Sequence, residues 1–326
     1  MVVTIKDIAE KVGVSVTTIS RVLNNRGYLS DSLKKKVSEA MEEMNYQPNE
    51  VARSLLRKKS HIIGLILPDI SHPFFGEVTK HIEAFAYDQG YKLMLCNSLH
   101  HKKKEKEYID LLRASRVDGI IMGSHTMSVK DYMSINLPLV TLDRQISKSI
   151  PFIASDNYQG GVLATQLLLR KKCRKIAYLS GNLRLSLLAK QRHDAFLEQV
   201  SGQDAQFQFI VKQTDLNGFK YKEYEKLVSG LFQEHPDLDG VFASSDMLAL
   251  QVLKQCRRLG KAVPDQVKVI GYDGISVGDA EDLTTIVQPI KMMGELAVRY
   301  LLLQIAGEQV PLETILPVRL SEKATT

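Results

Sequence analysis

The stretch VGVSVTTISRVLNN, residues 12–25, decides how the N-terminal part of the chain folds. It is rich in valine and threonine, which favour strands, yet it lies among segments with helical periodicity. On a helix, at about 100° per residue, Ile19, Val22 and Leu23 gather on one arc and the more polar residues lie outside it. A strand would alternate, and this stretch does not. The sequence therefore predicts a helix that begins at an N-cap, Ser15.

The neighbouring segments predict a helix on each side of this stretch. Thr4 caps the segment IKDIAEKVG, with Asp7 three residues later in place of the usual glutamate. Ser30 caps a third segment, DSLKKKVSEAMEEMNY. The small side chain of Ala9 allows close helix packing, and Gly13 suits a tight turn. Together these features indicate a helix-turn-helix, whose second helix enters the DNA major groove.

The side of the second helix that points away from its apolar arc has the chemistry of a groove-reading surface. Arg21 can bond two acceptors on guanine, and the methyl groups of Val16 and Thr17 can contact thymine methyls. The hydroxyls of Thr18 and Ser20 can bond phosphates. The alternative is a small helical bundle without a ligand. The DNA contacts predicted for this head are Thr4, Ser15, Val16, Thr17, Thr18, Ser20, Arg21 and Asn24.

The charge distribution leaves the same two alternatives open. The net charge is +6 over 326 residues, and residues 1–60 hold eleven bases against seven acids, so the rest of the chain is nearly neutral. A basic head on a nearly neutral body is typical of polyanion binding, but a solvated basic face has the same composition. The length predicts two or three domains.

Composition and motifs point away from membranes, secretion and catalysis. We expect no membrane span, because no run of 18 apolar residues occurs, and no signal peptide. The three cysteines, Cys96, Cys173 and Cys256, form no C-x-x-C pair and suggest buried, reduced thiols in a cytoplasmic protein. Common catalytic and nucleotide-binding motifs are absent, so we expect no enzyme, cofactor or metal. The segment KKKEKE after His100 and His101 is interpreted as a solvated helix start, not a metal site.

From His61 onward, short apolar runs alternate with helical periods, which predicts doubly wound parallel sheets in two lobes. The predicted crossings between the lobes are IASDNYQGG, residues 153–161, and TTIVQPI, residues 284–290. The predicted strands lie within 61–68, 91–97, 117–123, 137–143, 174–181, 239–245 and 267–274. The predicted helices lie within 74–90, 104–116, 158–172, 187–200, 221–232 and 246–260.

Polar and aromatic residues follow the predicted strands, where ligands bind in parallel sheets. Phe74 and Phe75 follow the first strand and can stack on a sugar ring or a base. Asp143, Ser245 and Asp273 lie at the ends of later strands. Aspartate with arginine can hold vicinal hydroxyls, which suits a polyol.

Several of these residues have structural alternatives. Asp156 and Asp246 precede helices, and for both we favour capping over ligand contact. Asp273 could order a loop instead, and Arg192 could pair with an acid on its own helix. Arg184, in the segment SGNLRLSLLAK, could meet an anionic ligand group or only solvent.

The motifs together resemble the lactose-repressor/galactose-repressor family of bacterial transcription regulators. The likeness covers the whole chain, through TIKDIAEKVGVSVTTISRVLN, YQPNEVARSLL, GLILPDISHPFF, VDGIIMG, SDNYQGG, IGYDG and LTTIVQP. Within the family the chain most resembles regulators of sucrose operons. The resemblance implies an α/β fold in which an all-α helix-turn-helix head, 1–48, is followed by a hinge helix, 49–59, and a two-lobed periplasmic-binding-protein-like core, 60–326.

The resemblance also implies roles for single residues. In the hinge, Leu55 would wedge into a minor-groove step, Ala52 would allow close approach and Arg53 or Arg57 would meet phosphate. A plain linker is the alternative, and Leu56 is a second candidate for the wedge. In the core, Arg192 matches the ligand-binding arginine of the family, whereas Ser245 departs from the asparagine of some sugar-binding relatives. The predicted ligand contacts are Phe74, Phe75, Asp143, Arg192, Ser245 and Asp273.

The resulting functional hypothesis is a repressor of carbohydrate-utilisation genes. It would bind a pseudopalindromic operator in double-stranded DNA as a homodimer and be released by a sugar or sugar phosphate. The alternatives are a regulator that needs a corepressor or a partner protein and, further away, a cytoplasmic sugar-binding protein or enzyme.

Overall fold

The computed structural model describes residues 3–24, 26–47, 59–124, 126–184, 188–214 and 221–326. The chain divides into two compact units, Met1–His61 and Ile62–Thr326. Residues 49–58 of the predicted hinge, which include Ala52, Arg53 and Leu55, lie outside the described residues.

The N-terminal unit contains the three predicted helices, α1 (Ile5–Val12), α2 (Val16–Leu23) and α3 (Asp31–Glu43). The side chains of Ser15 and Ser30 accept hydrogen bonds from the backbone as N-caps, and the Asp7 carboxylate accepts from the Thr4 amide at 2.7 Å. Gly13 ends α1 with a φ of 74°, a left-handed conformation that glycine adopts without strain. The small core of this unit consists of Ile8, Ala9, Ile19 and Val37. The helix-turn-helix prediction is confirmed.

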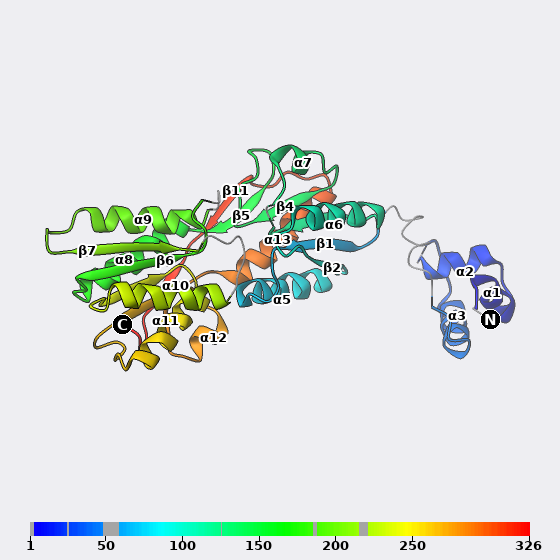
Figure 1. The fold of residues 1–326 in the computed structure, drawn as a ribbon. Coiled ribbons are helices and arrows are strands. Elements are labelled where there is room, and N and C mark those ends of the chain that lie inside the picture. Colours follow the sequence, from blue (N-terminus) through cyan, green and yellow to red (C-terminus); the bar gives the residue numbers. More distant parts are fainter. Residues whose placement is uncertain (1–2, 25, 48–58, 125, 185–187, 215–220) are drawn as a thin grey trace. The chain divides into compact units, whose positions relative to one another are not determined.

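Among the described residues of the second unit, six strands form each of two sheets, which define two lobes (Figure 1). In lobe 1 the strands are parallel, in the order β11-β5-β4-β3-β1-β2. In lobe 2 the order is β12-β10-β9-β8-β6-β7, and only β12 is antiparallel to its neighbour. The strands of lobe 1 are β1 (Ile62–Leu67), β2 (Lys92–Asn97), β3 (Gly119–Met122), β4 (Leu139–Leu142), β5 (Phe152–Ser155) and β11 (Glu313–Leu316). The strands of lobe 2 are β6 (Lys175–Ser180), β7 (Gln208–Gln213), β8 (Gly240–Ala243), β9 (Lys268–Asp273), β10 (Thr284–Val287) and β12 (Arg319–Ser321).

Helices cover both faces of each sheet, as the continuous apolar strands require. In lobe 1, α5 and α13 pack on one face and α6 and α7 on the other. In lobe 2, α8 and α9 pack on one face and α10 and α11 on the other, with the short α12 beside α11. Their bounds are α5 (Pro73–Asp88), α6 (Lys102–Ala114), α7 (Val129–Met133), α8 (Asn157–Arg170), α9 (Lys190–Ser201), α10 (Tyr221–Glu234), α11 (Asp246–Leu259), α12 (Ser276–Asp279) and α13 (Ile290–Ile305). The predicted doubly wound core is confirmed, and none of the described helices has the length and apolar character needed to cross a bilayer.

The described chain passes between the lobes three times. It leaves β5 for α8 at Asp156, and it returns from β10 to α13 through Gln288 and Pro289. Both crossings were predicted. A third, from β11 to β12 through Pro317 and Val318, was not.

Candidate functional site

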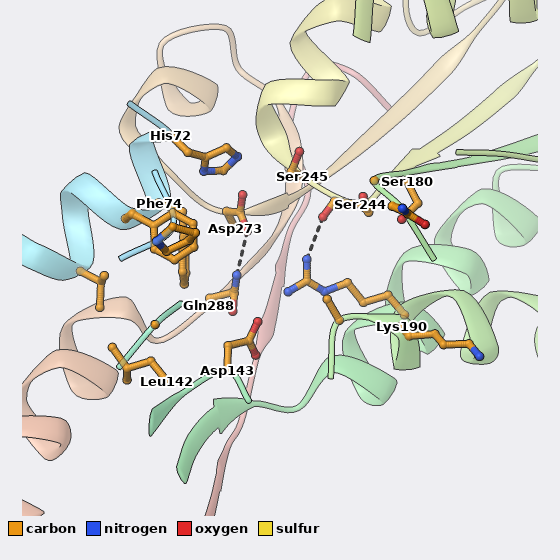
Figure 2. A pocket seen from close by; sticks show the side chains of 18 of the residues that line it. His72, Phe74, Leu142, Asp143, Ser180, Lys190, Ser244, Ser245, Asp273 and Gln288 are labelled. Carbon is orange, nitrogen blue, oxygen red and sulfur yellow. Dashed lines mark hydrogen bonds between the residues drawn. The ribbon is translucent and has the colours of Figure 1, made fainter. Parts of the chain in front are cut away.

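A cavity of the core lies between the two lobes, at the carboxyl ends of the strands (Figure 2). Its volume is about 180 Å³, and side chains of both lobes and of the second crossing line it. All six predicted ligand contacts are among the lining residues: Phe74, Phe75, Asp143, Arg192, Ser245 and Asp273. The structure thus brings these residues together, and their contact with a ligand stays a prediction.

The aromatic side of the cavity is built by the start of α5. Pro73 occupies the first turn of the helix, where its missing amide proton costs nothing, and the two phenylalanines follow. The rings of Phe74 and Phe75 meet edge to face, with centroids 5.2 Å apart. His72 lies beside them, and burial lowers its pKa to about 4, so the imidazole is neutral at physiological pH.

Arg192 projects from α9 and is almost completely buried. Its Nε donates to Asn157 Oδ1 at 2.7 Å and its Nη1 to the carbonyl of Ser244 at 2.7 Å. The guanidinium carbon lies 3.5 Å from the centre of the Tyr272 ring, a cation–π contact. The alternative that Arg192 pairs with an acid on its own helix is therefore wrong.

Two carboxyl groups face this cavity, those of half-buried Asp143 and buried Asp273, and both residues have unusual backbones. Asp143 follows β4 with a φ of 52°, and Asp273 ends β9 with a φ of 127°. Such strain in side-chain-bearing residues gathers at functional sites. Burial raises the pKa of both carboxyls, and the negative charge of Asp246 raises that of Asp273 further.

The two oxygens of Asp273 differ in their surroundings. Oδ1 accepts from Gln288 Nε2 at 2.7 Å, whereas Oδ2 is buried and has no hydrogen-bond partner in the described part of the chain. A buried carboxylate oxygen without a donor is costly and calls for an explanation. A hydroxyl group of a bound ligand would provide the missing donor.

The two aspartates predicted to cap helices, Asp156 and Asp246, have different roles in the structure. Asp156 caps α8 as predicted, because Oδ1 accepts from the Gln159 amide at 2.8 Å. The prediction for Asp246 was wrong: the cap of α11 is Ser245, whose hydroxyl accepts from the Leu248 amide at 3.3 Å.

Asp246 is instead fully buried under the loop that follows β9. Its carboxylate accepts from the amides of Gly274 and Ile275 at 2.8 and 2.9 Å and from the Thr285 hydroxyl at 2.5 Å. Burial raises its pKa to about 6. Asp246 therefore orders the loop next to Asp273.

Sequence reasoning missed two amide side chains at the site. Asn157 follows the predicted cap and is fully buried between Asp143 and Arg192. Gln288 lies in the second crossing, where it donates to Asp273 and accepts from the Ser155 hydroxyl at 2.6 Å. Both residues stand in segments that were recognised as crossings, and an amide at a crossing was the available signal.

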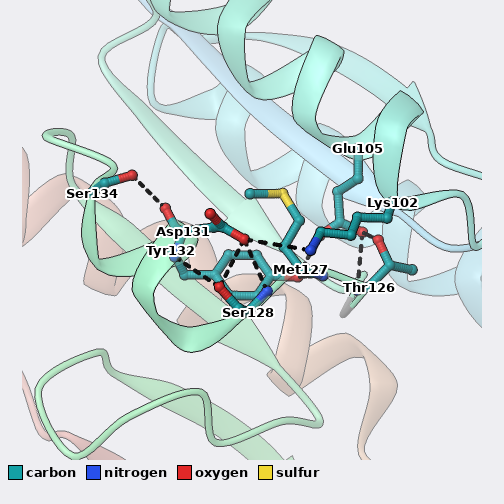
Figure 3. A network of polar contacts seen from close by, with 8 residues as sticks. All are labelled: Lys102, Glu105, Thr126, Met127, Ser128, Asp131, Tyr132 and Ser134. Atoms are coloured by element: carbon teal, nitrogen blue, oxygen red, sulfur yellow. Dashed lines mark hydrogen bonds and ion pairs between the residues drawn. The ribbon is translucent and has the colours of Figure 1, made fainter.

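A second polar network contradicts the prediction for KKKEKE at one residue, Glu105, whereas the helix start and the Lys103–Glu107 pair agree with it (Figure 3). Glu105 was expected on a solvated helix start, but its side chain is fully buried. Its carboxylate accepts from the hydroxyls of Tyr132 and Ser124, and from that of Thr126 at 2.8 Å. The network joins α6 to the loop after β3 and to α7.

In the N-terminal unit, the residues predicted to touch bases share one exposed surface. Val16, Thr17 and Arg21 are exposed on α2, opposite buried Ile19. An aromatic side chain outside the predicted set, Tyr28, is also fully exposed. That these residues contact DNA stays a prediction.

Comparisons with known proteins match both units. The profile described as "Bacterial regulatory proteins, lacI family" matches residues 4–49. The profile described as "Periplasmic binding proteins and sugar binding domain of LacI family" matches residues 60–324.

Curated relatives match almost the entire chain. The chain is 40% identical to the ribose operon repressor of Halalkalibacterium halodurans, over 99% of this chain and 97% of that one. It is 39% identical to the sucrose operon repressor of Pediococcus pentosaceus, over 97% of each. These values are too close to favour the sucrose type over the ribose type.

Solved structures match as well. A LacI-type regulator of Alkaliphilus metalliredigens in complex with D-xylulofuranose is 33% identical, with a TM-score of 0.75 over 82% of this chain and 99% of that one. The lac repressor dimer bound to operator and the anti-inducer ONPF is 26% identical, with a TM-score of 0.85 over 100% of this chain and 99% of that one. By these matches and by its own architecture, the chain belongs to the LacI family of bacterial regulatory proteins.

Proposed function

We propose that this protein is a sugar-responsive repressor of a carbohydrate-utilisation operon. It acts in the cytoplasm, binds a pseudopalindromic operator as a homodimer, catalyses no reaction and releases the DNA when a sugar occupies the cavity between the lobes. Its relatives are named as repressors of ribose and sucrose operons, and the lac repressor neighbour is a dimer on its operator. The domain limits proposed are 1–48, 49–59 and 60–326.

For the DNA, we assign base reading to Val16, Thr17 and Arg21, which are exposed on α2. The remaining predicted contacts of the head serve phosphates and positioning. In the hinge, Leu55 acts as the minor-groove wedge, with Ala52 and Arg53 beside it.

The observation that carries the effector proposal is the buried Oδ2 of Asp273, which lacks a donor in the described residues. A sugar supplies hydroxyl donors, and the Phe74 and Phe75 rings offer an apolar surface for its C–H face. We infer an uncharged sugar in preference to a phosphorylated one. Asp143 and Asp273, once ionised, would repel a phosphate, and Arg192 already donates to Asn157 and Ser244.

The mechanism is linkage between two sites. The effector contacts residues of both lobes and so favours one lobe geometry, whereas the operator favours another. A coupling of about 1–3 kcal/mol corresponds to a change in operator affinity of about 5–150-fold.

Fluorescence anisotropy tests this proposal. The operator is first selected from a random duplex library, and the full chain is titrated onto it at fixed salt with and without D-ribose, D-xylulose, sucrose and D-ribose 5-phosphate. We expect one of the uncharged sugars to weaken binding at least about fivefold, and the phosphorylated sugar to have less effect.

The other outcomes identify the alternatives. Tighter binding with a small molecule indicates a corepressor-dependent regulator, and selective binding only with an added protein indicates a partner-dependent one. Sugar binding without any selective DNA binding contradicts the proposal and indicates a sugar-binding protein or enzyme.

A further inference from the structure

Asn157 stands where the chain first passes from one lobe to the other. It is the first residue of α8 in lobe 2, two residues after β5 ends in lobe 1, and its side chain is fully buried. Its carboxamide touches a charged cavity residue from each lobe. Nδ2 donates to Asp143 Oδ1 at 3.2 Å, and Oδ1 accepts from Arg192 Nε at 2.7 Å.

The chemistry of the neighbours fixes the orientation of this amide. A guanidinium only donates and a carboxylate accepts, so the oxygen must face Arg192 and the nitrogen must face Asp143. The second N–H donates to the carbonyl of Ser155 at 3.0 Å. Only a side chain with one acceptor end and one donor end can make all three of these contacts.

The packing of α8 keeps the amide within reach of Arg192. One turn after Asn157 come Gly160 and Gly161, which lie against Tyr272 and against the backbone of α9. A Cβ at Gly161 would lie only 2.7 Å from the carbonyl oxygen of Arg192. The glycine pair thus permits the close α8–α9 approach that joins Asn157 to Arg192.

We propose that Asn157 is a positioning residue that fixes Asp143 of lobe 1 relative to Arg192 of lobe 2, so that a bound sugar meets both as one unit. This inference rests on the proposed function, because it assumes that the sugar binds in this cavity. Asn157 acts through its two neighbours. The donor–acceptor polarity of its amide is the property that matters.

A double-mutant cycle measures how much the donor–acceptor polarity of the Asn157 amide contributes to sugar affinity. Asn157→Asp keeps the acceptor for Arg192 but turns a carboxylate toward Asp143. In the Asp143→Asn background, the new amide at 143 can donate to the new carboxylate at 157, so the bond re-forms with reversed polarity. The lost bond to Ser155 is common to both backgrounds and cancels in the cycle.

Calorimetric titration of the full chain with the panel sugar that wild type binds gives the four affinities. Measurement at about pH 8 limits the sharing of a proton between the two carboxyls. We expect Asn157→Asp to weaken sugar binding about tenfold or more when Asp143 is intact, but about threefold or less in the Asp143→Asn background. Asn136→Asp, at an exposed asparagine of lobe 1, is the matched control and leaves the affinity unchanged.

Thermal unfolding of the same variants separates positioning from mere stability. The inference is overturned if Asn157→Asp weakens sugar binding equally in both backgrounds, whatever it does to the unfolding temperature. If Asn157→Asp does not fold when Asp143 is intact, Asn157→Ala replaces it, and Asp143→Ala, which leaves no acceptor for the Asn157 amide, replaces Asp143→Asn in the cycle. A smaller loss of sugar affinity in the Asp143→Ala background than with Asp143 intact again supports the inference, and equal losses overturn it. If wild type binds no panel sugar, the proposed function fails first, and this inference with it.

Discussion

Substituting Gly161 by alanine tests the contact between α8 and α9 that places the cavity residues. An alanine Cβ would lie 2.7 Å from the carbonyl oxygen of Arg192 and 2.8 Å from the Cβ of Ala195. Neither atom belongs to a flexible side chain, so the clash is relieved only by moving one helix away from the other.

The expected magnitude follows from two opposing effects. Alanine in a helix interior gains about 1 kcal/mol over glycine, whereas overpacking costs about 1–3 kcal/mol. Because backbone atoms cannot rotate away, we expect the clash to dominate, with a net loss of up to about 2 kcal/mol. For a unit of this size, that loss lowers Tm by up to about 8 °C. Sugar affinity should fall as well, because Arg192 moves with α9.

The matched control is Gly230→Ala in α10, where nothing lies within 4 Å of the added Cβ. We expect this variant to be stabilised by about 0.5–1 kcal/mol, with unchanged sugar affinity. Thermal and urea unfolding of the full chain, monitored by circular dichroism, compares the two variants with wild type. If Gly161→Ala is stabilised as much as Gly230→Ala, the α8–α9 contact is not as close as described and the reasoning fails.

Three further predictions concern other parts of the chain. Glu105→Gln leaves buried hydroxyls without one of their acceptors and should lower the unfolding free energy by about 1–3 kcal/mol. Glu107→Gln, at an exposed ion pair, is the control and should change the unfolding free energy by less than about 1 kcal/mol. Urea titrations measure both changes. Equal effects would argue against the buried network. Because burial raises the pKa of Asp273 in the folded state, the unfolded state ionises first as pH rises above about 4, which lowers the free energy of unfolding of wild type. The stability gain of Asp273→Asn over wild type in urea should therefore grow from pH about 4 toward neutrality, and a gain independent of pH would refute the assignment. Exchanging Val16 and Thr17 should alter the operators selected from a random library while the sugar response persists; unchanged selection would place specificity elsewhere.

The elements with strong local signals could be predicted from the sequence. The helices of the head were predicted from their caps, Ser15 and Ser30, and the inner strands from continuous apolar runs. Strands that gain their stability from distant partners were missed, among them β5, β7, β11 and β12. β11 pairs with β5 across some 160 residues of chain, and nothing local encodes that pairing.

The residues of the candidate site also fall into those that local sequence signals predicted and those that they did not. Residues placed at strand ends, such as Asp143 and Asp273, were found because parallel sheets direct strand ends to one edge. The amide of Asn157 was missed because its role depends on two partners that lie 14 and 35 residues away. Glu105 was assigned to solvent although it shares a helix face with Ile109 and Leu112, which are both buried. The charge of the neighbouring lysines concealed that periodicity.

The three passages of the chain between the lobes also determine what kind of movement the core can make. Two bodies joined by one strand can rotate in almost any direction, whereas three connections resist twisting and sliding and leave bending as the easiest motion. We therefore expect the cavity to open and close mainly by bending, which changes a single angle between the lobes. If a sugar binds in the cavity and an operator binds the head, the two ligands need only prefer different values of that one angle in order to communicate.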